Sequence, residues 1–267
     1  MDAQTIAAHG EALFHAWQTR TPVLPLLERM PDLSLDDAYR IQLDFVSRRV
    51  AAGETIVGKK IGVTTRVVQE MLGVFQPDFG QLTSGMLFVE GDVVALDGLI
   101  QPKAEAELAF VLKDDLVGPG ITAQDVIRAT DYVVPCFEII DSRIRDWKIR
   151  IQDTVADNAS CGVVVLGRTR GNPRELDLAG ASMVLECNGE ERSRNAFATD
   201  AGAPAEAVAW LANTLGELGI PFRAGEVILS GSQSPLVPVR DGDELVCTVS
   251  GLGSCRVRFA GRSAVGC

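Results

Sequence analysis

The spacing of apolar side chains changes near residue 55. Before that point, apolar residues recur every three or four positions in two segments, 2–19 and 34–53, and this period predicts two amphipathic helices. Ser34 stands where the second helix should be capped, and Gly53 stands where it should end. The pattern therefore predicts a small helical region over residues 1–55.

From residue 56 onward, short apolar runs alternate with glycine-rich turns, which is typical of strands. The expected strands are 56–63, 105–111, 133–140, 161–167 and a series between 226 and 259, with a hairpin over 86–94. Two further helices are expected, one capped by Thr122 and one over 204–218. The sequence thus predicts an α+β protein whose larger domain, residues 56–261, is mainly β.

Three glutamates stand in two of these strand runs. Glu105 and Glu107 alternate with apolar residues, so their side chains share one face, about 7 Å apart along the strand. Glu138 is the one acid in the run 133–140, whose other side chains favour burial. A buried carboxylate without a partner is costly, and it normally finds a cation, hydrogen bonds or a proton. A divalent metal would satisfy all three, although solvent-facing Glu pairs are also common on half-buried strands.

The type of ligand indicates the type of metal. Carboxylate oxygens suit Mg²⁺ or Mn²⁺, whose remaining positions are open to water or a chelating substrate. No Cys or His stands near these acids in a ligand-like spacing, which argues against zinc. Gly251-Leu252-Gly253 lacks the third glycine and the following helix of a dinucleotide site, so no nucleotide cofactor is expected.

Two lysines and one aspartate are further candidates. Lys59 and Lys60 stand in a glycine-bounded strand run and point to opposite faces, so one of them should face inward; the alternative is a solvent-facing basic pair. The segment 76–80 has turn composition, and it either forms an ordinary loop or supplies Asp78 as the acid–base partner of the inward lysine. The small, polar segment 153–162 would let backbone and hydroxyl groups approach a ligand, although caps and turns use the same residues.

Charge and composition limit the partners of this chain. Acidic residues outnumber basic ones by 36 to 25, and the net charge of −11 disfavours nucleic acid and anionic membranes. Hydrophobic residues make up 46% of the 267 residues, enough for a proper core. Because we find no membrane-length apolar stretch and no signal peptide, we expect a cytoplasmic protein with reduced cysteines.

Five segments, in their order and spacing, resemble the 2-keto-4-pentenoate hydratases, also called 2-hydroxypenta-2,4-dienoate hydratases. They are Gly58–Gly62, Gln76–Gly80, Pro102–Glu107, Asp141–Trp147 and Asp153–Gly162. The resemblance covers nearly the whole chain. It implies the fumarylacetoacetate hydrolase superfamily, whose catalytic core is a distorted β-roll or sandwich.

The resemblance also implies an activity and a site. The activity is that of a hydro-lyase in meta-cleavage degradation of aromatic compounds, which adds water to 2-hydroxypenta-2,4-dienoate to give 4-hydroxy-2-oxopentanoate. The expected partner is therefore a small 2-oxo or 2-hydroxy dienoic acid, and the expected assembly is a homo-oligomer. The implied metal ligands are Glu105, Glu107 and Glu138, and the implied active-site residues are Lys60, Asp78 and Ser160.

Three other functions remain open at this stage. 4-Oxalocrotonate decarboxylase shares the metal acids and the lysine, and it would need a group such as Arg143 for the distal carboxylate of its substrate, unless that arginine is tied to Asp141 or Asp157. A carbon–carbon bond hydrolase of the fumarylacetoacetate type usually employs a His–Glu pair, yet His9 and His15 both fall in the first helix. The third alternative is a non-catalytic partner subunit.

Overall fold

A computed structural model describes residues 1–64, 77–197, 203–232 and 234–261 of the chain. Its helices are α1 (Ala3–Thr19), α2 (Leu26–Arg29), α3 (Leu35–Ala51), α5 (Ala123–Ala129), α6 (Ile151–Ala156) and α7 (Pro204–Glu217), with short 3₁₀ turns η1 (Ser84–Met86), η2 (Leu96–Gly98), η3 (Arg145–Trp147) and η4 (Asn158–Ser160). Its strands are β1 (Ile56–Gly62), β2 (Asp78–Thr83), β3 (Leu87–Val89), β4 (Val93–Ala95), β5 (Lys103–Leu112), β6 (Thr130–Ile140), β7 (Cys161–Leu166), β8 (Ser182–Cys187), β9 (Glu190–Ala196), β10 (Val227–Leu229), β11 (Val237–Pro238), β12 (Glu244–Val249) and β13 (Gly253–Ala260).

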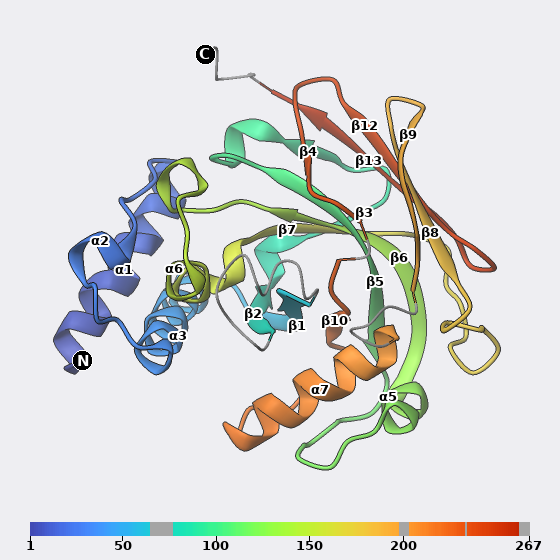
Figure 1. Ribbon diagram of the computed structural model, residues 1–267, viewed down its shortest axis with the longest axis horizontal. Coiled ribbons are helices and arrows are strands. Elements are labelled where there is room, and N and C mark those ends of the chain that lie inside the picture. Colours follow the sequence, from blue (N-terminus) through green and yellow to red (C-terminus); the bar gives the residue numbers. More distant parts are fainter. Residues whose placement is uncertain (65–76, 198–202, 233, 262–267) are drawn as a thin grey trace.

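The described strands form two sheets. The larger sheet has the order β2-β1-β10-β5-β6-β7-β3, with β11 added beside β5, and the smaller sheet has the order β4-β13-β12-β8-β9. One apolar core joins them and also takes in α7, because Phe110, Leu245 and Leu211 belong to a single cluster. Figure 1 shows α7 and the strands of the two sheets. This mainly β core with a few helices confirms the predicted α+β class.

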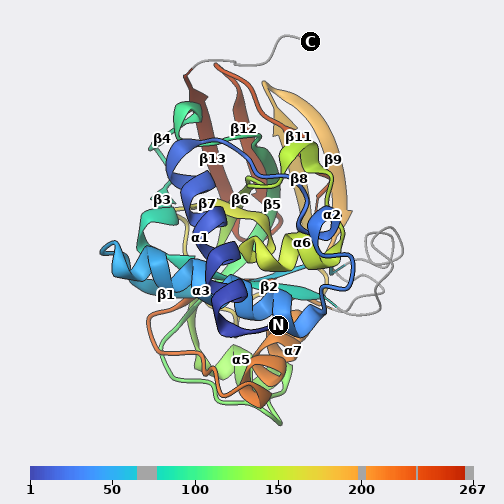
Figure 2. The ribbon, with the colours of Figure 1, turned by 90° about the vertical axis from the view of Figure 1, so that its left-hand side faces the viewer.

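The N-terminal helices form a second apolar cluster. Leu13 of α1, Phe45 of α3 and Val155 of α6 are buried together, and Figure 2 shows these three helices side by side in front of the larger sheet. Ser34 caps α3 as predicted, because its hydroxyl accepts a hydrogen bond from the Asp37 backbone N–H. No helix within the described ranges is long and apolar enough to cross a bilayer.

The predicted hairpin over residues 86–94 is wrong. β3 pairs with β7 in the larger sheet, whereas β4 pairs with β13 in the smaller sheet. The turn around Gly91 therefore carries the chain from one sheet to the other. Two half-buried strands joined by a turn have the same sequence pattern whether they pair with each other or with strands of different sheets. The reason is that the choice of partner depends on distant parts of the chain.

Residues 78–80 have the composition of a turn but form the beginning of a strand. β2 starts at Asp78, pairs antiparallel with β1, and is buried along its whole length. Tyr39 of α3 stacks on Phe79 at 4.3 Å between ring centroids, so the helical region covers this strand. The interpretation of the segment as an ordinary loop is therefore wrong for residues 78–80.

Candidate functional site

Three carboxylates meet on one face of the larger sheet. The register pairs Glu105 of β5 directly with Glu138 of β6, and Glu107 follows two residues later on the same face. One oxygen of each side chain lies within 4.8 Å of an oxygen of the other two. Glu107 and Glu138 are completely buried. Carboxylates this close repel one another unless a cation or protons lie between them.

The free oxygens of this cluster fit a divalent cation. Within the described part of the chain, Glu107 Oε1 lacks a hydrogen-bond partner, and the Glu138 carboxylate accepts no hydrogen bond although the Lys60 ammonium lies 3.2 Å from its Oε1. Glu107 Oε2 accepts a bond from the Gly231 backbone N–H at 3.0 Å. Burial and the adjacent Glu138 carboxylate raise the pKa of Glu105 to about 8 and raise the pKa of Glu107 well above its ordinary value. Buried carboxylate oxygens directed at a common centre are the ligands that Mg²⁺ and similar ions prefer.

β1 places its two lysines on opposite faces, as predicted. Lys60 Nζ lies 3.2 Å from Glu138 Oε1, whereas Lys59 forms an ion pair with Glu226 on the other face. Both lysines are buried, so the alternative of a solvent-facing pair is wrong. Burial alone would lower the pKa of Lys60, but the charges of Glu138 and Asp78 outweigh it and raise that pKa above its ordinary value. Lys60 is therefore a fixed cation beside the three glutamates.

Asp78 joins this site because β2 lies next to β1. The register places Asp78 opposite Gly62, where a Cβ atom would lie 2.3 Å from Asp78 Oδ1 and 3.3 Å from Lys60 Nζ. The missing side chain of Gly62 therefore leaves the space in which the carboxylate and the ammonium approach each other. Burial raises the pKa of Asp78 to about 6, although Lys60 acts in the opposite direction. A carboxyl group with this pKa can exchange a proton near neutral pH.

Ser160 is placed less directly. Its hydroxyl lies 3.2 Å from the hydroxyl of Thr154, and its carbonyl accepts a bond from the Asp141 backbone N–H. The next residue, Cys161, has a buried thiol whose pKa is raised by burial and then by the nearby Glu138 carboxylate. The structure thus brings five of the six predicted residues together, namely Lys60, Asp78, Glu105, Glu107 and Glu138. Ser160 is linked to them through its neighbour in the chain, Cys161. Sequence reasoning treated Cys161 only as a buried thiol, because its nearness to Glu138 follows from the pairing of β7 with β6.

The Arg143 side chain is buried and donates its hydrogen bonds to groups inside the protein. Its side chain is 1% exposed, its Nε donates to Asp157 Oδ1 at 2.6 Å, and its Nη1 donates to the carbonyl oxygen of Cys161 at 2.8 Å. Nη1 also donates to the Asp141 carbonyl, and Nη2 donates to the Asp157 carbonyl. The hypothesis that Arg143 could bind the distal carboxylate of a decarboxylase substrate is therefore wrong, and the alternative of an internal tie to Asp141 or Asp157 is confirmed.

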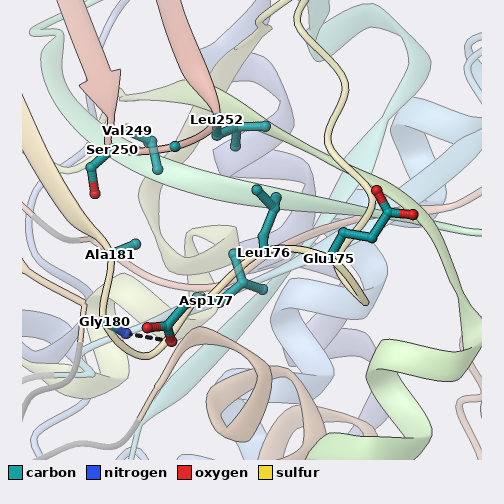
Figure 3. A pocket seen from close by; sticks show the side chains of 10 residues that line it. Glu175, Leu176, Asp177, Gly180, Ala181, Val249, Ser250 and Leu252 are labelled. Carbon is teal, nitrogen blue, oxygen red and sulfur yellow. Dashed lines mark hydrogen bonds between the residues drawn. The ribbon is translucent and has the colours of Figure 1, made fainter.

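A separate pocket lies on the smaller sheet. It has a volume of about 330 Å³ and is lined by the loop 175–181 and by the turn 249–252 between β12 and β13 (Figure 3). The carboxylate of Asp177 accepts the Gly180 N–H at 2.9 Å, which closes a local turn. None of the predicted site residues lines this pocket, so we assign the chemistry to the carboxylate cluster.

Comparisons with known proteins identify the family of this chain. The profile of the family described as "Fumarylacetoacetate (FAA) hydrolase C-terminal" matches residues 58–260. A 2-hydroxyhexa-2,4-dienoate hydratase of Comamonas testosteroni is 53% identical over 97% of this chain and 98% of its own length. A 2-hydroxypent-2,4-dienoate hydratase of Pseudomonas putida is 54% identical over 82% of this chain and 100% of its own length.

A solved structure resembles the whole chain in fold. The 4-oxalocrotonate decarboxylase of Pseudomonas putida G7, complexed with magnesium and adipate, superposes with a TM-score of 0.93 at 36% identity, over 97% of this chain and 98% of the decarboxylase. Such agreement in sequence and in fold extends over the helical region as well as the β core. The chain belongs to the 2-keto-4-pentenoate hydratase family of the fumarylacetoacetate hydrolase superfamily.

Proposed function

We propose that this protein is a metal-dependent hydratase that adds water to 2-hydroxypenta-2,4-dienoate and forms 4-hydroxy-2-oxopentanoate. The observation that carries the proposal is the cluster of Glu105, Glu107 and Glu138 with the Lys60 ammonium beside it. Relatives named as hydratases of pentadienoate and hexadienoate, at 54% and 53% identity, support the same substrate class.

The three glutamates are the proposed ligands of Mg²⁺ or Mn²⁺. Glu107 Oε1 and the Glu138 carboxylate, which accept no hydrogen bond in the described part of the chain, support this role, and the magnesium complex of the related decarboxylase supports the choice of ion. An ion held by these residues would supply positive charge for polarising the 2-oxo or 2-hydroxy group and the carboxylate of the substrate. The chain itself orients the substrate, excludes water and moves the protons.

Lys60 and Asp78 are the proposed proton carriers. In the first step the 2-hydroxyl group of the dienol loses a proton and C5 gains one, which gives 2-oxopent-3-enoate. Asp78 suits proton exchange because its pKa lies at about 6, and Lys60 holds a positive charge next to it. Water then adds to C4 while C3 gains a proton. Ser160, the last residue of η4 directly before β7, is proposed to position the substrate.

Decarboxylation of 4-oxalocrotonate is the second candidate, and the 0.93 TM-score of the decarboxylase favours it specifically. That reaction needs a cationic or hydrogen-bonding group for the distal carboxylate, and Arg143 is already bound to Asp157. A carbon–carbon bond hydrolase is disfavoured because the two histidines of the chain, His9 and His15, both lie in α1. Hydration therefore remains the proposed reaction.

One assay separates these functions. The purified protein with Mg²⁺ is incubated with freshly generated 2-hydroxypenta-2,4-dienoate and, separately, with 2-oxohex-3-enedioate, while diene absorbance, CO₂ release and product mass are followed. We expect loss of the five-carbon diene with a gain of one water, a higher kcat/KM for the monoacid, and no turnover by Glu107→Gln. Faster CO₂ release from the diacid would establish the decarboxylase instead, and no metal-dependent turnover of either acid would favour a non-catalytic subunit.

A further inference from the structure

The turn η4 holds an unusual backbone conformation. Three successive residues, Asn158, Ala159 and Ser160, have φ values of 54°, 50° and 54°. Non-glycine residues rarely adopt this left-handed region, and three in sequence persist only where the surrounding structure holds them. The turn ends at Ser160, directly before the thiol that lies near Glu138.

A buried ion pair holds this turn. The Arg143 backbone N–H donates to Asp157 Oδ2 at 2.9 Å, its Nε donates to Asp157 Oδ1, and its Nη1 donates to the carbonyl of Cys161. Arg143 therefore binds both the residue before the turn and the residue after it. The backbone N–H of Ser160 completes the turn by donating to the Asp157 carbonyl at 3.0 Å.

The first residue of the turn binds strand β2 as a neighbouring strand would. The Gln81 backbone N–H donates to Asn158 Oδ1 at 2.8 Å, and Asn158 Nδ2 donates to the Gln81 carbonyl at 2.8 Å. β2 is the terminal strand of the described order, so this amide supplies bonds on the side away from β1. The approach is close, because a Cβ atom on Gly80 would lie 2.6 Å from the Asn158 carbonyl oxygen.

Strand β2 also carries Asp78, three residues before Gln81. A sideways movement of this strand would change the distance from the Asp78 carboxylate to Lys60, because the two groups meet over Gly62. Figures 1 and 2 both show β2 beside α6, the helix that leads into the turn. The Asn158 amide is completely buried, and both of its polar atoms are used on Gln81.

We propose that Asn158 is a positioning residue for the reaction: its side-chain amide fixes the edge strand β2, and with it Asp78, against the Ser160 turn. The proposal rests on the proposed function only in that Asp78 carries a proton there. Among the described residues, the Asn158 amide forms its hydrogen bonds with Gln81 and none with Lys60 or the three glutamates. Loss of the Asn158 amide should therefore reduce kcat and leave the binding of substrate and metal intact.

The test replaces Asn158 by glycine, because glycine adopts the left-handed conformation freely and the substitution removes the side chain that carries the amide. A matched control is Asn188→Gly: Asn188 also has a positive φ, 53°, and its Oδ1 also accepts a backbone N–H, that of Glu244 at 2.9 Å, but it lies in the β8–β9 turn. For each variant, kcat, KM, Mn²⁺ affinity, Tm and the amide exchange of the segment 78–83 are measured.

For Asn158→Gly we expect kcat to fall by about 10- to 100-fold, with KM and Mn²⁺ affinity within about twofold of wild type and faster amide exchange at Gln81. Asn188→Gly should match wild type in every kinetic value. Unchanged kcat in Asn158→Gly would overturn the proposal, and so would a joint collapse of kcat, Mn²⁺ affinity and Tm, which indicates general loss of structure. If the wild-type protein does not turn over the dienoate, the proposed function fails. The positioning role is tested separately, because unchanged amide exchange at Gln81 in Asn158→Gly would overturn it in either case.

Discussion

Without its divalent ion, the protein should lose stability as the pH rises. Burial, and then the Glu138 carboxylate, raise the pKa of Glu105 from 4.5 to about 8. A carboxyl group with a raised pKa binds its proton more tightly in the folded state than in the unfolded state. Its stabilising contribution is therefore complete below the unfolded pKa of 4.5 and is lost as the pH rises through about 8.

The size of this effect follows from the shift. Between about pH 6 and pH 9 the lost contribution amounts to about two pKa units, or about 3 kcal/mol at roughly 1.4 kcal/mol per unit. In a chain of this size, such a loss lowers Tm by about 6 to 12 °C. A bound divalent ion favours the ionised carboxylates, so Mg²⁺ should raise Tm most at the alkaline end.

The assay is thermal unfolding across this pH range, once with excess chelator and once with Mg²⁺. The control is Glu105→Gln, which keeps the shape of the side chain and cannot ionise. Because the net charge of −11 makes the whole chain sensitive to pH, the informative quantity is the difference in slope between wild type and Glu105→Gln in chelator. Parallel slopes for the two proteins would refute the reasoning, and so would a Mg²⁺ effect on Tm that does not grow with pH.

The remaining predictions concern single side chains. Lys60→Ala should lower kcat by about 100-fold or more, whereas Lys59→Ala should keep kcat and lower Tm, because it leaves a buried acid unpaired. Glu107→Gln should weaken Mn²⁺ binding by about tenfold or more in a calorimetric titration, because it removes an anionic ligand. Gly62→Ala should lower kcat by about tenfold or more, because the new methyl group would overlap a site carboxylate, whereas Gly98→Ala, with no atom within 4 Å, should match wild type.

Each of these expectations has a result that contradicts it. Equal kcat values for Lys60→Ala and Lys59→Ala would contradict the assignment of the catalytic role to Lys60 alone. Unchanged Mn²⁺ affinity in Glu107→Gln, or full activity of wild type in excess chelator, would contradict the role of the three carboxylates as metal ligands. Wild-type kcat in Gly62→Ala would show that the approach of the Asp78 carboxylate to Lys60 is not needed for turnover.

The sequence by itself located most of the site. Alternation along one strand run placed Glu105 and Glu107 on a common face, and the apolar surroundings of Glu138 marked it as a buried acid that needs a partner. The same period placed the two adjacent lysines on opposite faces of a strand. The cytoplasmic location and the homo-oligomeric assembly stay predictions.

Only the tertiary structure decided how these residues meet. The register of β5 and β6 put Glu105 opposite Glu138, and the pairing of β2 with β1 brought Asp78 to Lys60 across Gly62. Tertiary contacts also decided that β3 and β4 pair in different sheets and that both lysines are buried. The ion pair between Arg143 and Asp157 likewise depends on the tertiary structure. The physical reason is that periodicity along a chain records which face of an element is buried, whereas the partner and the register of that element depend on packing between segments far apart in sequence.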